Sequence, residues 1–232
     1  MNPVKEMVRS VGNSYVRRLC ENDFAWQKST VNERPIEYRF ALQCLTDARP
    51  KSVLDVGTGT TAWPRTLADC GYYVRAIDNV RDYWPSGMTN RHWQVDDVDI
   101  TKPFSFTGRY DAITCISVME HIVDHESAVR NMLGLLQNGG SLIITTPYNH
   151  QTHVPNVYKR DDALYGKDLP YICRSHSVAE IDQWQNLGAK LKRRELWRLF
   201  SGPVWATGDR AEWKQASETE PHQLGLFEFQ KH

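Results

Sequence analysis

The order of apolar and polar positions predicts an alternation of strands and helices over the middle of the chain. Between residues 52 and 147, short runs that are apolar on both faces alternate with segments of helical periodicity. Strands buried on both faces indicate a parallel sheet with helices packed on each side. Strands are expected at residues 52–58, 73–78, 92–97, 110–117 and 141–147, and helices at residues 62–71 and 126–140.

The segments on either side of this alternation carry further elements. Before it, apolar spacing predicts helices over residues 3–28 and 35–48. After it, Ser177 and Glu180 form a capping box for a helix over residues 177–188. Two late strands are expected at residues 190–200 and 223–230, with a loop at residues 201–222 between them.

Composition and charge are those of an ordinary globular protein. Of the 232 residues, 24% are charged and 41% hydrophobic, and Lys+Arg and Asp+Glu are equal at 28 each. This balance favours neither nucleic acid nor an anionic membrane as a partner. The five cysteines form no CxxC pair, and we find no signal peptide or membrane span, so a cytoplasmic protein is expected. Without repeats or an interdomain linker, residues 1–232 are interpreted as one domain, with N-terminal helices at residues 1–48.

The stretch DVGTGTTA, which starts at Asp55, has the composition of a ligand-binding turn between a strand and a helix. Gly57 and Gly59 lack a Cβ, so the backbone there can approach a ligand closely. The stretch also fits the dinucleotide fingerprint G-x-G-x-x-A, with Asp78 as the ribose contact, so an NAD enzyme is one interpretation. Asp55 argues against it, because a carboxylate at that point repels a pyrophosphate and suits a ligand that carries a cation.

At these motifs the sequence resembles the class I S-adenosylmethionine-dependent methyltransferases. The resemblance runs from about residue 50 to the C-terminus and rests on VLDVGTGT, VRAIDN, VDDVDI, YDAITCISVMEHI and LLQNGGSLIITTPY, in the family's order. It implies an α/β, Rossmann-like, seven-stranded, mostly parallel sheet with a C-terminal antiparallel strand and helices on both faces. It also implies S-adenosyl-L-methionine as the cofactor.

The resemblance implies a set of cofactor-binding residues at the ends of the first four strands: Asp55, Gly57, Gly59, Asp78, Asp97, Val98, Ile116 and Ser117. Asp55 is expected near the methionine ammonium, and the two glycines beneath the methionine and ribose. Asp78 is expected to accept hydrogen bonds from the ribose hydroxyls, and Asp97 to bind the adenine amine with Val98 against the ring. Ile116 and Ser117 are expected beside the methionine part.

The stretch after the fourth strand carries the candidate catalytic residues. His121 is expected to be the general base, because an imidazole has a pKa suited to taking a proton at neutral pH, with Glu120 as its orienter. The pair is alternatively a support for the cofactor pocket. Glu120, His121 and His125 could hold a metal ion, as a similar cluster does in the small-RNA 2′-O-methyltransferases that this pattern resembles. Ser117 stands in place of that pattern's first glutamate, so no metal is expected.

The resemblance implies a substrate cap at residues 148–176, the segment after the fifth strand, which is rich in tyrosine, histidine and charge. The expected acceptor contacts are Tyr148, Asn149, His153, Tyr158 and His176. So polar a pocket favours O-methylation of a small hydroxylated acceptor. Further motifs, among them GTGTTAWP and PYICRSHS, resemble a bacterial subgroup linked to surface-polysaccharide assembly, which implies a sugar, a nucleotide sugar or a glycan terminus. An RNA methyltransferase and a non-catalytic cofactor- or partner-binding module remain as alternatives, no membrane partner is expected, and the oligomeric state is left open.

Overall fold

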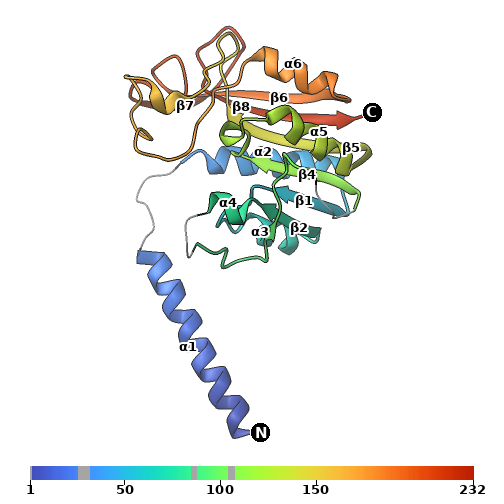
Figure 1. The fold of residues 1–232 in the computed structure, drawn as a ribbon, viewed down its shortest axis with the longest axis vertical. Helices are drawn as coiled ribbons and strands as arrows, with labels where there is room; N and C mark the ends of the chain where they lie inside the picture. Colours follow the sequence, from blue (N-terminus) through green and yellow to red (C-terminus); the bar gives the residue numbers. More distant parts are fainter. Residues whose placement is uncertain (1, 26–31, 85–87, 104–107) are drawn as a thin grey trace. The chain divides into compact units, whose positions relative to one another are not determined.

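A computed structural model describes residues 2–25, 32–84, 88–103 and 108–232, and the chain divides into units of residues 1–35 and 36–232. The first unit contains helix α1 (Pro3–Ala25), as its apolar spacing predicted. The last three residues of the expected helix, 26–28, lie outside the described residues. The second unit contains the sheet and all of the candidate site residues (Figure 1).

Within the described residues, the sheet has eight strands in the order β3-β2-β1-β4-β5-β8-β6-β7. The pairs from β3 to β5 are parallel, and the pairs β5–β8, β8–β6 and β6–β7 are antiparallel. The predicted Rossmann-like arrangement with an antiparallel C-terminal strand is therefore confirmed. The strands are β1 (Ser52–Val56), β2 (Tyr73–Asp78), β3 (Asp96–Asp97), β4 (Tyr110–Ile116), β5 (Leu136–Pro147), β6 (Ala189–Phe200), β7 (Arg210–Ala216) and β8 (Leu224–Lys231).

The expected number of seven strands is wrong, because β7 lies in the segment predicted as a loop. This strand pairs with β6 alone, and its side chains are exposed or half-buried. An edge strand of this kind needs no run of apolar residues, so hydrophobic patterning does not reveal it. The third predicted strand shrinks to Asp96–Asp97, and a short helix, α4 (Val80–Tyr83), was not expected.

The helix expected over residues 126–140 ends earlier than predicted. Helix α5 (His125–Leu135) is followed directly by β5, so the two glycines after it belong to a strand. A Cβ on Gly140 would lie 2.8 Å from the carbonyl oxygen of Asp111, and Gly139 has φ +77°. These glycines allow the register of β5 against β4 to shift, and they do not cap a helix.

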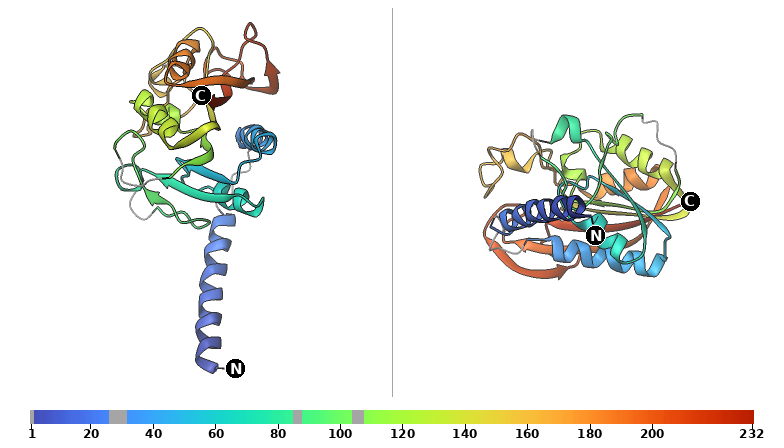
Figure 2. Two further views of the ribbon diagram at one scale, coloured as in Figure 1. Left: turned by 90° about the vertical axis from the view of Figure 1, so that its right-hand side faces the viewer. Right: turned by 90° about the horizontal axis from the view of Figure 1, so that it is seen from below.

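Helices cover both faces of the sheet, as expected (Figure 2). One face packs against α2 (Arg34–Ala48) and α3 (Trp63–Asp69), and the other against α5 and α6 (Val178–Asn186). Along β5, Ile143 packs with the first pair of helices while Leu142 and Ile144 pack with the second. Of the helices within the described ranges, none is both long and apolar enough to cross a bilayer.

Strand β8 carries a buried carboxylate at the centre of the antiparallel part of the sheet. Glu228 is 0% exposed, and its Oε1 accepts hydrogen bonds from the Ser141 hydroxyl and the Lys192 ammonium, each at 3.0 Å. The Arg193 guanidinium lies 3.6 Å from the other carboxylate oxygen. Buried carboxylates need such donors, because their desolvation is otherwise uncompensated.

Candidate functional site

The carboxyl ends of the parallel strands meet at one edge of the sheet, where the predicted site residues follow them. Asp55 near the end of β1 is 2% exposed. Its Oδ2 accepts a hydrogen bond from the Thr58 hydroxyl at 2.5 Å, and its Oδ1 accepts one from the Thr114 hydroxyl at 2.7 Å. Asp55 therefore connects the loop after β1 to β4, and its expected closeness to a ligand ammonium stays a prediction.

Both glycines of the loop have positive φ angles, but the space around them differs. Gly57 has φ +75°, and a Cβ there would lie 2.3 Å from Cγ2 of Val118, so this glycine lets the loop pack against the residues after β4. Gly59 has φ +56°, and a Cβ there would meet no atom of the described residues within 4 Å. The space beside Gly59 is thus open, as a site for a ligand requires.

Asp78, the last residue of β2, contacts the same loop. Its Oδ2 accepts a hydrogen bond from the Gly59 amide at 2.7 Å. Burial raises the pKa of Asp78, against the opposing effect of that amide. Asn90, which was not expected, donates from Nδ2 to the carbonyl oxygens of Gly59 at 2.8 Å and Thr61 at 3.0 Å. No sequence signal marks Asn90, because its partners are backbone atoms about thirty residues away.

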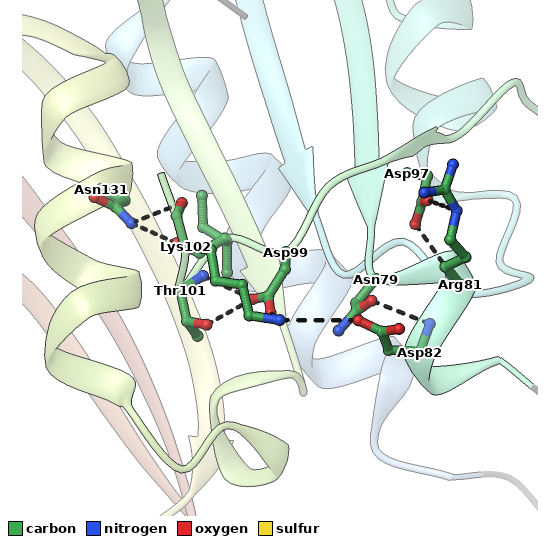
Figure 3. A network of polar contacts seen from close by, with 9 residues as sticks. Asn79, Arg81, Asp82, Asp97, Asp99, Thr101, Lys102 and Asn131 are labelled. Atoms are coloured by element: carbon green, nitrogen blue, oxygen red, sulfur yellow. Dashed lines mark hydrogen bonds and ion pairs between the residues drawn. The ribbon is translucent and has the colours of Figure 1, made fainter. Parts of the chain in front are cut away.

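The acid at the end of β3 already has a cationic partner. The Asp97 carboxylate pairs with the Arg81 guanidinium at 3.0 Å and accepts a hydrogen bond from the Arg81 amide at 3.0 Å (Figure 3). Val98 is partly buried against the core, and its amide donates to the Asp78 carbonyl at 2.8 Å. A hydrogen bond from an adenine amine to Asp97 would therefore share the carboxylate with Arg81.

Ser117, directly after β4, has an unusual backbone conformation held by a carboxylate from α2. Its φ is +52°, a region that residues other than glycine rarely adopt. Its hydroxyl donates to Oε1 of Glu37 at 2.6 Å, and the Thr145 hydroxyl donates to the same oxygen at 2.7 Å. Glu37 is fully buried, and Ile116 just before Ser117 is 8% exposed. The expectations for this edge did not include Glu37, because the resemblance begins only after α2.

His121 lies in the short helix η1 (Met119–His121), which follows the carboxyl end of β4. Its Nδ1 contacts the Ile172 carbonyl oxygen at 2.6 Å, and a carbonyl can only accept, so Nδ1 carries the proton. In the neutral ring, Nε2 is then the basic nitrogen. Glu120 is buried, and its Oε1 lies 3.9 Å from Nε2. The contact that orients the imidazole therefore comes from the cap, while Glu120 lies beside the basic nitrogen.

The segment predicted as a cap, residues 148–176, begins with residues that hold it to the domain. Tyr148 is 0% exposed, its ring stacks on His222, and its hydroxyl bonds Nδ1 of His150 at 2.9 Å. Asn149 donates to the Pro203 carbonyl at 2.7 Å. Their expected acceptor contacts stay predictions, and the structure gives both residues an architectural role.

Two further residues of the segment predicted as a cap, His153 and His176, form a histidine cluster with His125. His176 is 0% exposed, and its Nδ1 bonds the Thr146 hydroxyl at 3.1 Å. The ring centroids of His125 and His153 lie 5.6 and 6.3 Å from that of His176, and Trp184 donates to Nδ1 of His125 at 3.0 Å. Within the described ranges, no group of His, Cys, Asp and Glu side chains is arranged to hold a metal ion.

Tyr158 belongs to an aromatic cluster beside His121. It lies in helix η2 (Val157–Lys159), and its ring centroid is 6.2 Å from those of both Tyr165 and Tyr171. The Tyr171 ring in turn meets the His121 ring edge-on at 4.9 Å. Of the five predicted acceptor contacts, Tyr158 is thus the one that ring contacts connect to the candidate base.

The buried histidine predicts a loss of stability in mild acid. Burial, with His125, His153 and Arg174 nearby, holds the pKa of His176 well below 6.5. The unfolded chain binds a proton there at higher pH than the folded protein, so the free energy of unfolding falls as pH drops below 6.5. By pH 5.5 this one group should contribute a loss of about 1.4 kcal/mol, measured by urea unfolding.

The matched variants are His176→Asn and His232→Asn. The first should reduce the pH dependence of the unfolding free energy by about one proton, and the second, at an exposed position, is the control for loss of an imidazole. An unchanged pH dependence in His176→Asn would contradict the assignment.

The sequence matches a family model described as a methyltransferase domain over residues 30–201. The ubiquinone biosynthesis O-methyltransferase of Coxiella burnetii is 29% identical over 120 residues, which are 48% of this chain and 50% of that protein. The protein of the same name from Escherichia coli is 32% identical over 104 residues, 41% of this chain and 42% of that protein. The chain spans about half the length of the curated relatives it matches.

Solved structures share the fold at low sequence identity. The 1,6-didemethyltoxoflavin-N1-methyltransferase of Burkholderia thailandensis, solved with 1,6-didemethyltoxoflavin and S-adenosylhomocysteine, aligns with a TM-score of 0.59 and 12% identity over 100% of this chain and 91% of its own. The N-methyltransferase NodS of Bradyrhizobium japonicum, in complex with S-adenosylhomocysteine, gives a TM-score of 0.52 and 15% identity over 86% of this chain and 87% of its own. At these identities the likeness concerns the fold alone.

Proposed function

The chain belongs to the methyltransferase domain family, and we propose that it transfers a methyl group from S-adenosyl-L-methionine to an oxygen of a small hydroxylated acceptor. The observation that carries the proposal is the placement of His121. Its Nδ1 is held by the Ile172 carbonyl at 2.6 Å, so Nε2 is the nitrogen that takes a proton. This base follows β4, three residues after Val118, which lies against Gly57 of the loop that we assign to the methyl donor.

The loop after β1 fits S-adenosylmethionine in shape and charge. The open space beside Gly59 receives the ligand, and Asp78 offers a carboxylate to the ribose hydroxyls. Asp55 and Asp78 suit a ligand that carries an ammonium and a sulfonium. The two solved structures described above both contain S-adenosylhomocysteine, the product that remains after methyl transfer. Asp97, Val98, Ile116 and Ser117 complete the proposed cofactor site.

The chain's contribution to the reaction is alignment and one proton transfer. Bound S-adenosylmethionine supplies a methyl group on a positively charged sulfur, which leaves as a neutral thioether. His121 takes the hydroxyl proton at Nε2 while the acceptor oxygen forms its bond to the methyl carbon. The Glu120 carboxylate, 3.9 Å from Nε2, stabilises the imidazolium that results.

Two acceptor classes suit the cap. A sugar, nucleotide sugar or glycan terminus matches the polar side chains of residues 148–176. An aromatic hydroxyl matches the cluster of Tyr158, Tyr165 and Tyr171 beside His121. The relatives described above are named O-methyltransferases, which supports oxygen as the accepting atom in both classes. The sequence motifs favour a sugar as the acceptor, and the screen described below compares it with the aromatic class.

Removal of the Asp78 carboxylate should weaken cofactor binding. Titration calorimetry of the full chain should show binding of S-adenosylhomocysteine, and Asp78→Ala should raise its Kd at least about tenfold, because hydrogen bonds to a charged group are lost. Asp69→Ala, an exposed acid in α3, is the control and should bind like the wild type. Absence of binding to the wild-type chain would refute the proposed function itself.

Removal of the His121 imidazole should slow the reaction without loss of cofactor. His121→Gln should lower kcat about a hundredfold, the contribution typical of a general base. The Kd of S-adenosylhomocysteine should stay within about twofold of the wild-type value, because His121 is not assigned to that ligand. The exposed His232→Gln is the control, and full activity in His121→Gln would exclude a general base.

A screen for methyl transfer should identify the acceptor class. The protein is incubated with isotopically labelled S-adenosylmethionine and with sugars, nucleotide sugars, phenols or RNA, and the products are read by mass spectrometry. We expect label on oxygen of a sugar or, as the second class, of a phenol. Label on RNA, with binding that falls steeply as salt rises, would instead identify an RNA methyltransferase. Label in no acceptor would favour a binding module that lacks turnover.

A further inference from the structure

We infer that Glu37 of helix α2 is a positioning residue for the methyl-donor site, which it serves by holding Ser117 in its left-handed conformation. The inference rests on the proposed function, because it assigns the edge at Ser117 to the donor. Glu37 is 0% exposed, and a buried carboxylate at this depth needs hydrogen-bond donors. Two of its donors are the side chains of Ser117, directly after β4, and of Thr145, near the end of the neighbouring strand β5.

The contacts around Ser117 form a closed ring of hydrogen bonds. The Ser117 amide donates to both the carbonyl and the hydroxyl oxygen of Thr145, each at 3.0 Å. The Thr145 hydroxyl donates to Oε1 of Glu37 at 2.7 Å, and the Ser117 hydroxyl donates to the same oxygen at 2.6 Å. Both the backbone and the side chain of Ser117 are therefore fixed, and Glu37 is the acceptor that completes the ring.

This ring maintains a conformation that serine does not favour. A φ of +52° brings a Cβ close to the backbone, so a residue other than glycine adopts it only where its surroundings impose it. Such residues gather at functional sites, and Ser117 lies where β4 opens toward the glycine loop. The next residue, Val118, occupies the space that a Cβ on Gly57 would need. The conformation of Ser117 therefore sets the place of Val118 and, through it, of the loop.

Helix α2 holds Glu37 firmly in place. Phe40, Ala41 and Cys44 of this helix are completely buried against the sheet. Tyr38, beside Glu37, stacks on Trp63 with ring centroids 4.4 Å apart and an angle of 13°. The Trp63 indole in turn donates to the Thr114 hydroxyl at 3.3 Å. Glu37 thus reaches the residue after β4, while its neighbour Tyr38 fixes α2 against α3.

Substitutions at Ser117 separate positioning from a direct contact. Ser117→Ala and Ser117→Gly both remove the hydroxyl, but only glycine adopts a positive φ without strain. If Glu37 acts by holding the conformation, Ser117→Ala should raise the Kd of S-adenosylhomocysteine about tenfold, and Ser117→Gly should raise it clearly less, by about threefold, because it loses the hydroxyl but not the backbone conformation. Equal losses in the two variants would overturn the inference, because they would indicate a hydroxyl that contacts the ligand directly.

Substitution of Glu37 itself gives the second half of the test. Glu37→Ala should raise the Kd of S-adenosylhomocysteine about tenfold, and the same change in a Ser117→Gly background should cause no further loss. Wild-type affinity in Glu37→Ala, or an undiminished loss in the double variant, would overturn the inference. If Glu37→Ala does not fold, the two Ser117 variants decide alone.

Glu228→Ala is the matched control, since Glu228 is equally buried and also accepts a serine hydroxyl, but lies within the antiparallel part of the sheet. It should lower the thermal midpoint while the Kd of S-adenosylhomocysteine stays within about twofold of the wild-type value. A tenfold rise in Kd in this variant would show that general destabilisation weakens binding, and would overturn the positioning role. The wild-type titration separates the two levels of failure: no binding rejects the proposed function, whereas normal wild-type binding with unaffected variants rejects only the role of Glu37.

Discussion

Carboxylates that are buried at the carboxyl edge of a parallel sheet must find hydrogen-bond donors inside the protein, and this requirement organises the candidate site. Asp55 finds its donors in the hydroxyls of Thr58 and Thr114, and Thr114 also accepts from the Trp63 indole. Glu37 finds two of its donors in Ser117 and Thr145. Each carboxylate therefore joins elements that are distant in sequence. Together they fix the loop after β1, strands β4 and β5 and helix α2 relative to one another.

Local pattern identified all five strands of the parallel half of the fold, although it overestimated the length of β3 and missed α4. The strand predicted at residues 73–78 is β2 as observed, and the Ser177 cap begins α6 where it was expected. Strands buried on both faces produce continuous apolar runs, so hydrophobicity identifies them. The half-exposed β7 gives no such run, and the glycines before Ser141 look like a helix end when only the local sequence is considered. Their conformation depends on contact with β4, which the local sequence does not contain.

The same division applies to the site. Acids and glycines at the ends of predicted strands were found because the strand order places them at one edge. Glu37, Asn90 and the carbonyl of Ile172 act through partners that lie 80, about 30 and 51 residues away in the chain. No spacing rule connects them to those partners. A single sequence therefore indicates candidate side chains for the chemistry, but not which groups orient them.

The place of β8 in the sheet has a consequence for how the protein is made. Residues 224–231 lie between β5 and β6, so during synthesis these two strands have no partner on their facing edges until that segment leaves the ribosome. The exposed edge would include Leu142, Ile143 and Ile144, an apolar stretch of the kind that pairs readily with other chains. The nascent protein thus passes through a stage in which the parallel half of the sheet has been synthesised while its edge strand β5 has no partner on one side. Slow translation or premature termination before residue 224 would extend that stage and favour aggregation or chaperone capture.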